Sequence, residues 1–317
     1  MTIAGSVASF VGMFILMIAT ALLLRRRGVL RSEHSTLLSV LLLDIVCPPL
    51  IFSSIAKANL HLKDLVAAGA VFGSEIVICF LSYLIGRWAL RLDRLALGAF
   101  VIAATFGSTG LIGNALVQVL FRDNTDLVSM SMFIGNFGVG IPGNTIGIFL
   151  AMRFGTRDHV TSLTQHFKSF LVMPCMVALY AGLVWSIWKL PTSGMGLDVV
   201  FGASRMIGAS LPFVTAMVVG LSLEKLDFGK DLGVLAAGAL LALIVEPWVA
   251  EQLINMYPVD QQTRLITVLF SAMPSTPLGV VFAVRYGGDV SLAGKLATFT
   301  LTMSAITLPL MALKIVH

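Results

Sequence analysis

Long apolar stretches separated by short polar connections run along the whole chain. Stretches of about 20 apolar residues, enough for a helix to cross the hydrocarbon core of a membrane, recur ten times. They lie near residues 5–24, 35–56, 64–87, 95–121, 127–152, 167–189, 199–223, 230–255, 262–285 and 290–315. The pattern predicts an all-α integral membrane protein with ten transmembrane helices, arranged as five plus five.

Composition supports a lipid environment. Of 317 residues, 57% are hydrophobic and only 12% are charged, and the mean hydropathy is +0.96. A soluble core does not need that much apolar sequence. The first apolar run ends in Arg25, Arg26 and Arg27 rather than in a small-residue cleavage site, which predicts a retained helix and not a signal peptide.

The basic residues alternate from one connection to the next. The first, third and fifth connections carry basic clusters around Arg25–Arg31, Arg87–Arg94 and Arg153–Lys168. These connections are therefore predicted to be cytoplasmic, which places both termini on the outer side. The net charge of +5 is explained by this topology, and no nucleic-acid partner is expected.

An odd number of helices in each half makes the second half enter the membrane inverted relative to the first. Residues 1–155 and 156–317 are expected to form these two five-helix repeats. Five pairs of identical residues, at two neighbouring offsets and in collinear order, support the pairing. They are Ser108 with Ser275, Pro142 with Pro309, Pro49 with Pro212, Arg122 with Arg285, and Asp126 with Asp289. Inverted repeats of transporters place the binding site at their interface, near the middle of the membrane.

One short polar break interrupts an apolar span in each half, at residues 106–111 (FGSTGL) and 273–278 (MPSTPL). Pro274 and Pro277 remove backbone donors and clash with the preceding turn, so two half-helices are predicted there. Gly107 and Gly110 allow a softer break in the first half. An unwound backbone survives inside a bilayer only where protein or a watery cavity supplies partners, so the matched pair of breaks predicts the central binding site of a transporter.

If the two breaks cross near the centre of the membrane, they would present two helix N-termini and four hydroxyl groups to one cavity, which suits a carboxylate. The alternative is that Ser and Thr only bond their own backbone or a neighbouring helix. The residues proposed to bind substrate at the breaks are Gly107, Ser108, Thr109, Gly110, Pro274, Ser275, Thr276 and Pro277. Asn136 and Asn144 of helix 5 either line the cavity or hold helices together.

Three acidic residues lie inside predicted spans, where ionisable groups are expensive and are functional candidates by default. Glu75 lies near the middle of helix 3 and is the first candidate for proton coupling. Glu246 precedes Pro247 in helix 8, the counterpart of helix 3 in the second repeat. Asp44 precedes Pro48 by one turn and either faces the cavity or caps the bend. A satisfied structural hydrogen bond is the alternative for each.

Several longer motifs resemble the auxin efflux carrier family, which includes bacterial malonate-type transporters and the plant auxin exporters. The resemblance covers nearly the whole chain. It is carried by Ala272–Ser275, Val281–Asp289, Thr307–Leu310, Cys47–Phe52, Leu211-Pro212 and Val219–Leu223. Family members often have Asn before the Thr of helix 4 and Ile-Pro after the later Gly, where this chain has Ser108 and Asn114-Ala115. Asn114 is therefore added as a candidate that supplies an amide to the substrate.

The resemblance implies a bile-acid/sodium-symporter-like fold. Helices 1, 2, 6 and 7 would form a scaffold that pairs two copies as a homodimer. Helices 3, 4, 5, 8, 9 and 10 would form the moving transport part, in which the broken helices 4 and 9 cross. It also implies a secondary active transporter of a small organic anion, such as a malonate-like dicarboxylate or an auxin-like acid. The expected location is the cell membrane, a bacterial inner membrane, with an elevator-type mechanism.

Other functional classes have less support. No HExxH or Walker motif is present, and Asp123–Asp126 only partly resembles the acidic cluster of a prenyl transferase. No enzyme activity and no cofactor are therefore expected. Cys47, Cys79 and Cys175 lack metal or disulfide spacing and are expected to be packed thiols. A sodium-coupled bile-acid-type symporter is the nearest rival, but the ninth-helix break has no carboxylate. A receptor or a channel is a further alternative.

Overall fold

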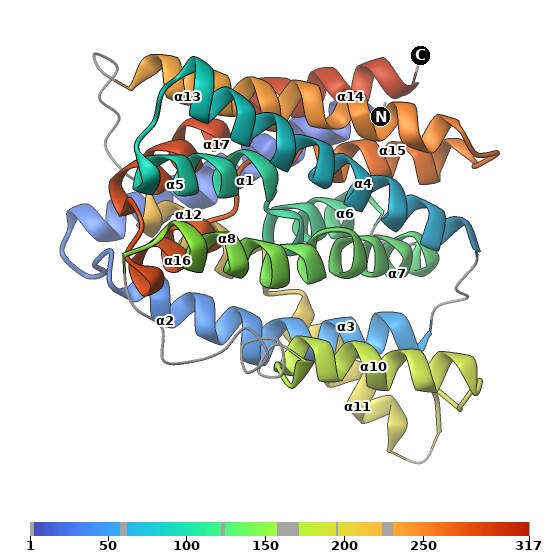
Figure 1. The fold of residues 1–317 in the computed structure, drawn as a ribbon. Helices are drawn as coiled ribbons and strands as arrows, with labels where there is room; N and C mark the ends of the chain where they lie inside the picture. The colour runs from blue at the N-terminus through green and yellow to red at the C-terminus, as the bar shows by residue number, and fades with distance from the viewer. Residues whose placement is uncertain are drawn as a thin grey trace.

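The computed structural model describes residues 3–57, 62–121, 124–156, 171–194, 196–223 and 231–316, and these residues are helical apart from short connections (Figure 1). Five helices are long and apolar enough to cross a membrane: Leu62–Ala89, Asp126–Phe154, Leu197–Leu221, Leu232–Asn255 and Val290–Lys314. Shorter apolar helices occupy Asp44–Ala56, Arg94–Thr105 and Pro174–Ile187. The prediction of an all-α, multi-pass membrane protein is confirmed.

Each predicted span corresponds to one helix or to a run of consecutive helical segments. The sixth predicted span begins outside the described residues. In chain order the segments are α1 (Ile3–Arg26), α2 (His34–Leu41), η1 (Leu42–Val46), α3 (Cys47–Ala56), α4 (Leu62–Leu84), η2 (Ile85–Ala89), α5 (Arg94–Thr105), η3 (Thr109–Gly113), α6 (Asn114–Leu120), α7 (Thr125–Ile134), η4 (Gly135–Gly140), η5 (Gly143–Gly147), α8 (Ile148–Phe154), α10 (Pro174–Ile187), α11 (Leu197–Gly208), α12 (Leu211–Ser222), α13 (Leu232–Leu240), η6 (Leu241–Val245), α14 (Glu246–Asn255), α15 (Gln261–Ser271), α16 (Leu278–Tyr286) and α17 (Val290–Val316).

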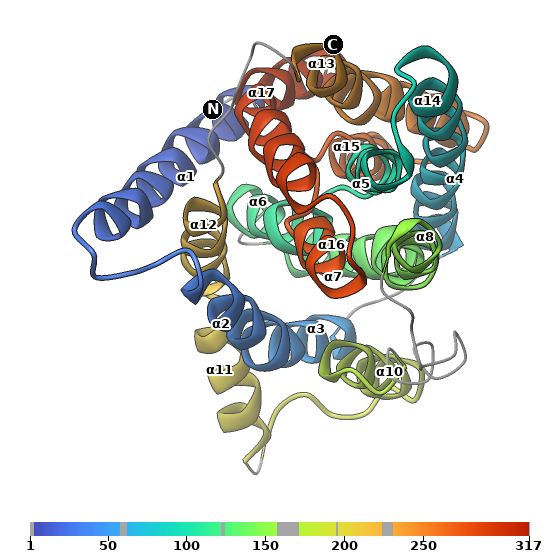
Figure 2. The same ribbon diagram turned by 60° about the vertical axis from the view of Figure 1, so that its left-hand side comes forward.

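The helices pack in two neighbouring groups. In one, α3 lies along α10 and α11, while α12 contacts both α1 and α2. In the other, α4 packs on α14, α15 and α5, and α17 packs on α13, α5 and α16. Figures 1 and 2 show α2, α3, α10 and α11 as a layer beside the rest of the bundle. The largest apolar cluster joins the groups, because α1, α3, α6, α7 and α15 all contribute buried side chains to it.

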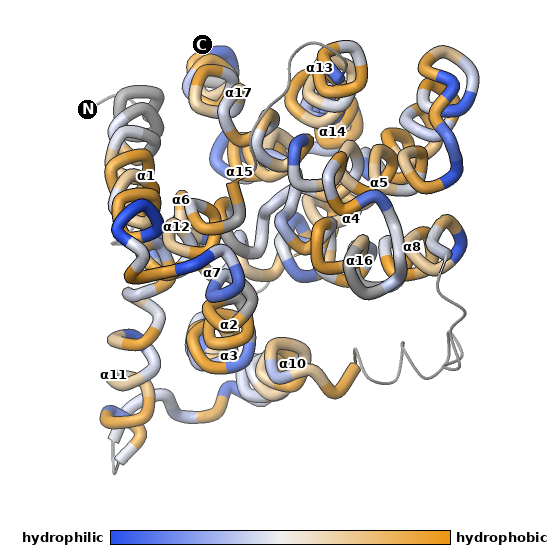
Figure 3. Tube along the Cα trace, turned by 90° about the vertical axis from the view of Figure 1, so that its left-hand side faces the viewer, coloured by the Kyte–Doolittle hydropathy of each residue, from blue (hydrophilic) through white to orange (hydrophobic). Residues whose placement is uncertain are grey.

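Hydrophilic residues gather at helix ends and connections, as the basic run at the end of α1 illustrates (Figure 3). At this end Arg25 donates hydrogen bonds to the carbonyl oxygens of Leu221 and Leu223, which fastens the end of α1 to the end of α12. Apolar helix sides with polar ends are what a membrane environment requires.

Of the six wide π-helical turns in the described part of the chain, three end two residues before a proline. These are η1 before Pro48, η4 before Pro142 and η6 before Pro247. A proline lacks the backbone N–H and its ring clashes with the carbonyl of the preceding turn. A wider turn makes room for the proline, and helical structure continues through each of these three positions.

Ion pairs connect the helices of the second group at their ends. Lys295 binds Asp231 at 2.6 Å, joining α17 to the start of α13, and Lys314 binds Glu251, joining the far end of α17 to α14. Lys63 of α4 binds Asp260, which caps α15, at 2.7 Å. These three ion pairs therefore connect α4, α13, α14, α15 and α17 to one another.

We expect the ion pair of Asp260 with Lys63 to make the stability of the folded protein depend on pH under acidic conditions. Partial burial raises the pKa of this carboxyl, but hydrogen bonds from Lys63 and Thr263 lower it more, to about 2. An unfolded aspartate titrates near 3.9, so the folded state is stabilised above about pH 4 and loses this stabilisation as the pH falls toward about 2. Its size is small, because both side chains are partly exposed.

Replacing Asp260 by asparagine keeps the cap of α15 and removes the charge. We expect wild type to unfold at a higher temperature than Asp260→Asn at pH 6, with the difference shrinking toward pH 2.5. Thermal unfolding in detergent across that range measures it. Lys63→Met is the matched variant and should reduce the same difference; a gap that is independent of pH would contradict the assignment.

Candidate functional site at the crossing of two interrupted helices

Both predicted breaks are present. The helix α5 ends at Thr105, Phe106 is extended with φ −98° and ψ 108°, and helical structure resumes at Thr109. The helix α15 ends at Ser271, and α16 begins at Leu278 after Pro277. The prolines of the second break remove two donors that a continuous helix would need, as predicted.

The two unwound segments meet and pair. Gly107 and Ser275 form an antiparallel bridge. The amide of Ser108 donates to the carbonyl oxygen of Pro274 at 2.7 Å, and the amide of Thr276 donates to that of Phe106 at 3.0 Å. Each break therefore supplies the backbone partners that the other one needs in a membrane interior. The predicted crossing of the two breaks is thereby formed.

On the second-half side, the polar groups at the break have partners. The Ser275 hydroxyl donates to the carbonyl oxygen of Ala103, and the Ser275 amide donates to Thr300 Oγ1 at 3.1 Å. Thr276 caps α16, because its Oγ1 accepts from the amide of Leu278 and its carbonyl accepts from that of Gly279. Thr276 therefore provides hydrogen-bond acceptors for the amides at the start of α16.

At the first break, by contrast, some polar groups have no hydrogen-bond partner among the described residues. The carbonyl of Ser108 accepts the first bonds of the new helix, from the amides of Ile112 at 2.7 Å and Gly113 at 3.1 Å. The N–H groups at the start of that helix, before Ile112, have no partner within it. The Ser108 hydroxyl is buried, with 2% exposure, and has no hydrogen-bond partner among the described residues.

Asn114 adds a second unsatisfied group close to this helix start. Its Nδ2 donates to the carbonyl of Gly110 at 3.2 Å, while its buried Oδ1 has no partner within the described part of the chain. A side chain at Gly135 of η4 would come within 3.5 Å of that Oδ1. The close approach of η4 therefore encloses Asn114 without supplying it with a donor.

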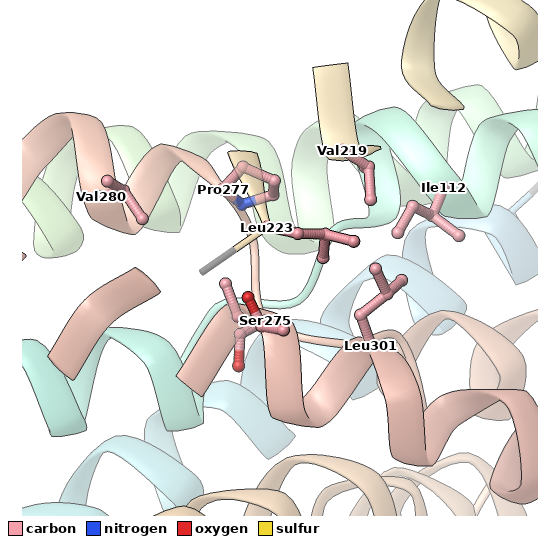
Figure 4. A pocket seen from close by; sticks show the side chains of 9 residues that line it. Ile112, Val219, Leu223, Ser275, Pro277, Val280 and Leu301 are labelled. Atoms are coloured by element: carbon pink, nitrogen blue, oxygen red, sulfur yellow. The ribbon is translucent and has the colours of Figure 1, made fainter. Parts of the chain in front are cut away.

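A cavity of about 20 Å³ lies beside the crossing (Figure 4). Ser275 and Pro277 of the second break, Ile112 of η3, Val219 of α12 and Thr298 of α17 are among the residues that line it. A space of this size holds about one water molecule. The crossing is thus closed to an organic anion in this conformation, and its cavity lies where α12 faces the broken helices.

Most of the other predicted binding residues lie at the two breaks, whereas the two asparagines of the fifth predicted helix do not. Gly107, Thr109, Gly110, Pro274 and Pro277 all lie within the two breaks or next to them. Asn136 lies in η4, where its Nδ2 donates to the carbonyl of Met132 at 2.7 Å, a bond within its own helix. Asn144 lies in η5, and its side chain is outside what the structure describes. Asn136 is not among the described residues that line the cavity.

The acidic candidates separate into a buried pair and an exposed residue. Glu75 of α4 and Glu246 at the start of α14 are 1% and 3% exposed, and their helices pack together. The two groups are close enough for their charges to interact, and neither carboxyl oxygen of Glu75 has a hydrogen-bond partner among the described residues. Asp44 of η1 is instead exposed at the helix surface, so it is not a buried group like the other two.

Thr300 and Ala103 take part in the crossing but were not predicted from the sequence. Thr300 belongs to a run of hydroxyl residues at alternate positions of α17, Thr298, Thr300, Thr302 and Ser304. That run was a usable signal, since polar side chains in an apolar helix need partners. Ala103 acts through its backbone, which no side-chain pattern reveals.

The arrangement defines a class: a multi-pass helical membrane protein in which two interrupted helices cross and leave polar groups at a helix start. Comparisons with known proteins find similarity to membrane transporters. Residues 6–152 match the model of a family described as "Membrane transport protein". An "Uncharacterized transporter" of Methanothermobacter thermautotrophicus is 24% identical over 296 residues, covering 91% of each chain. Both matches are to transporters and neither is to an enzyme, in agreement with the expectation from the sequence.

Proposed function

We propose that the protein is a secondary active transporter that binds the carboxylate of a small organic anion at the crossing. The observation that carries this proposal is the open helix start in the first half. There the unpartnered Ser108 hydroxyl adjoins backbone N–H groups at the positive end of a helix. Buried donors without partners are costly, and a bound carboxylate would satisfy them. The similarity to transporters supports the same reading.

We further propose that the two helix groups are the scaffold and transport parts of an elevator-type carrier. The scaffold would comprise α1, α2, α3, α10, α11 and α12 and hold two copies together, and the remaining helices would move. Support comes from the ion pairs at the ends of α13, α14, α15 and α17, which stiffen the proposed moving part. At the boundary the Ser129 hydroxyl of α7 donates to the carbonyl of Ser54 in α3 at 2.7 Å.

In this proposal the two five-helix halves are inverted repeats in the cell membrane, with both termini outside. The breaks at Ser108 and Ser275 occupy equivalent places in the two halves. The contacts of Ser275 are structural, since its hydroxyl and amide already have partners. Substrate recognition is therefore assigned mainly to the Ser108 side, where Thr109, Gly110 and Asn114 complete the helix start.

Ser108→Ala tests this assignment. A hydrogen bond to a charged group contributes about 1.5–3 kcal/mol, so we expect anion affinity to fall roughly tenfold to a hundredfold. The melting temperature should change little, because the hydroxyl has no hydrogen bond to lose within the part of the chain that the structure describes. Calorimetric titration with carboxylates and solute counterflow in proteoliposomes measure the two effects.

Ser275→Ala is the matched variant. It removes the buried bond to Ala103 and should lower the melting temperature, with a smaller direct effect on affinity. The assignment fails if Ser108→Ala binds anions as wild type does. If the double variant Ser108→Ala with Ser275→Ala still transports normally, the crossing is not the binding site.

A further inference from the structure

Two of the three cysteines meet between α3 and α10. Cys47 lies in the first turn of α3 and Cys175 in the first turn of α10, and the two helices lie side by side (Figures 1 and 2). Both residues are present as thiols, and the two thiol groups are in hydrogen-bonding contact. Both side chains belong to the largest apolar cluster. Their wide separation along the chain hides this pair, because helix packing creates it.

A second contact between the same helices supports this alignment. A Cβ at Gly182 of α10 would lie 2.9 Å from the Cβ of Ile55 and 3.1 Å from the carbonyl oxygen of Phe52. Gly182 lies about two turns beyond Cys175, and the α3 residues that it meets lie about two turns beyond Cys47. The helices therefore run in the same direction with the cysteines opposite each other. The close approach at Gly182 suits the short backbone separation that a disulfide needs.

The two thiols differ in their access to the membrane. Cys47 is 5% exposed, whereas Cys175 is partly exposed, and its apolar neighbours Pro174 and Val177 are exposed on α10. A small apolar molecule dissolved in the membrane therefore reaches Cys175 first. Asp44 of η1 is close enough to Cys175 for their charges to interact, so a carboxyl group that can transfer a proton lies beside the more accessible thiol.

We propose that Cys47 and Cys175 form a redox-sensitive dithiol, which membrane-soluble organic hydroperoxides oxidise to a disulfide that links α3 to α10. This proposal does not rest on the proposed transport function. It assigns different parts to the two thiols, because only Cys175 is partly exposed.

The oxidation takes two steps. The sulfur of Cys175 attacks the terminal oxygen of the hydroperoxide, the O–O bond breaks, and a sulfenic acid forms. The thiol proton passes through the carboxyl group of Asp44 to the departing alkoxide, which leaves as an alcohol. The sulfur of Cys47 then attacks the sulfenic sulfur, and the hydroxyl group leaves as water with the proton of Cys47. Two thiols and one hydroperoxide thus give one disulfide, one alcohol and one water.

Peptide mapping of the full chain in proteoliposomes tests the proposal. The protein is treated with cumene hydroperoxide or with hydrogen peroxide, denatured and alkylated, and its peptides are identified by mass spectrometry. We expect a linked peptide that joins Cys47 to Cys175 and is lighter by two hydrogen atoms than its two thiol parts. Cumene hydroperoxide should form it roughly tenfold faster or more, because it dissolves in the membrane. The dithiol proposal is overturned if both cysteines remain alkylatable or are oxidised without the link, and equal rates overturn the membrane route.

Three variants separate the parts of the site. Oxidation should raise the melting temperature of wild type, because the link constrains the unfolded chain. Cys79→Ala, the matched control in α4, should show the same rise, and Cys47→Ala should show none. Asp44→Asn should slow formation of the link roughly tenfold or more, since a positioned group that transfers the proton is lost. An equal rise in Cys47→Ala overturns the pairing, and an unchanged rate in Asp44→Asn overturns the part given to Asp44. If Cys47→Ala does not fold, the peptide map of wild type still decides whether the link forms.

Discussion

Replacing Glu75 by glutamine is expected to abolish uptake driven by a proton gradient while exchange of substrate across the membrane continues. Both carboxyl oxygens of Glu75 are buried without a hydrogen-bond partner among the described residues, and Glu246 is close enough to interact with it. A charge in such a place is very costly, so the neutral, protonated acid is the form that this environment tolerates. Glutamine imitates that form but cannot release a proton, so the carrier should still move its substrate without coupling.

The measurement compares two assays of the same proteoliposomes. Uptake driven by an imposed pH difference should fall to the level of empty liposomes, while counterflow at equal pH should stay within about twofold of wild type. Glu246→Gln tests whether the pair acts as a unit. Asp44→Asn is the matched control, because Asp44 is an acid in a predicted span that is exposed and should have no effect. Full gradient-driven uptake by Glu75→Gln would show that coupling lies elsewhere.

The position of the Glu75 and Glu246 pair links it to the crossing of the two breaks. The two residues lie on α4 and α14, which we propose to be equivalent helices of the two repeats. Gly73 allows these helices to approach closely, since a side chain there would come within 3.0 Å of Leu253. The same packing that buries the acids places them in the part that also carries α15 of the crossing. Protonation could therefore act on the crossing through helices that are in direct contact.

The sequence predicted the breaks well because their cause is local. Pro274 and Pro277 cannot take part in a regular helix, and paired positions in the two halves indicated that Ser108 and Ser275 belong together. The sequence also predicted that the two breaks differ, because the second contains prolines, which a regular helix excludes, and the first contains glycines, which only permit a break. The structure adds that Thr276 and Thr300 satisfy the second break, while Ser108 and Asn114 stay open.

The partners of these residues could not be predicted from the sequence, because they depend on tertiary packing. The amide of Ser275 donates to Thr300 and not to Thr298, because Thr300 lies on the face of α17 that meets the crossing. Likewise, the polar amide of Asn136 bonds its own helix, a choice that is set by the rotation of η4. Periodicity identifies an apolar span but does not fix the rotation of a helix that is apolar on all sides.

Gly107→Val is expected to prevent the two breaks from pairing and to eliminate transport. A Cβ at Gly107 would lie 3.2 Å from both the Cβ and the carbonyl oxygen of Met273, and the larger valine side chain would push the segments apart. The bonds from Ser108 to Pro274 and from Thr276 to Phe106 would then be strained or lost. A buried backbone group left unpaired costs about 1–3 kcal/mol, and the loss of even one of these bonds leaves two such groups, so the variant should lose at least about 2–6 kcal/mol of stability.

Thermal unfolding in detergent and counterflow in proteoliposomes test this variant together. The matched control is Gly69→Val in α4, where a Cβ would meet no atom within 4 Å and the residue is exposed. That control should fold and transport as wild type does, because the added methyl groups face lipid. A Gly107→Val protein with normal stability and normal transport would mean that the close approach of the two breaks is not required. The binding site would then have to be sought away from the crossing, at the buried acids between α4 and α14.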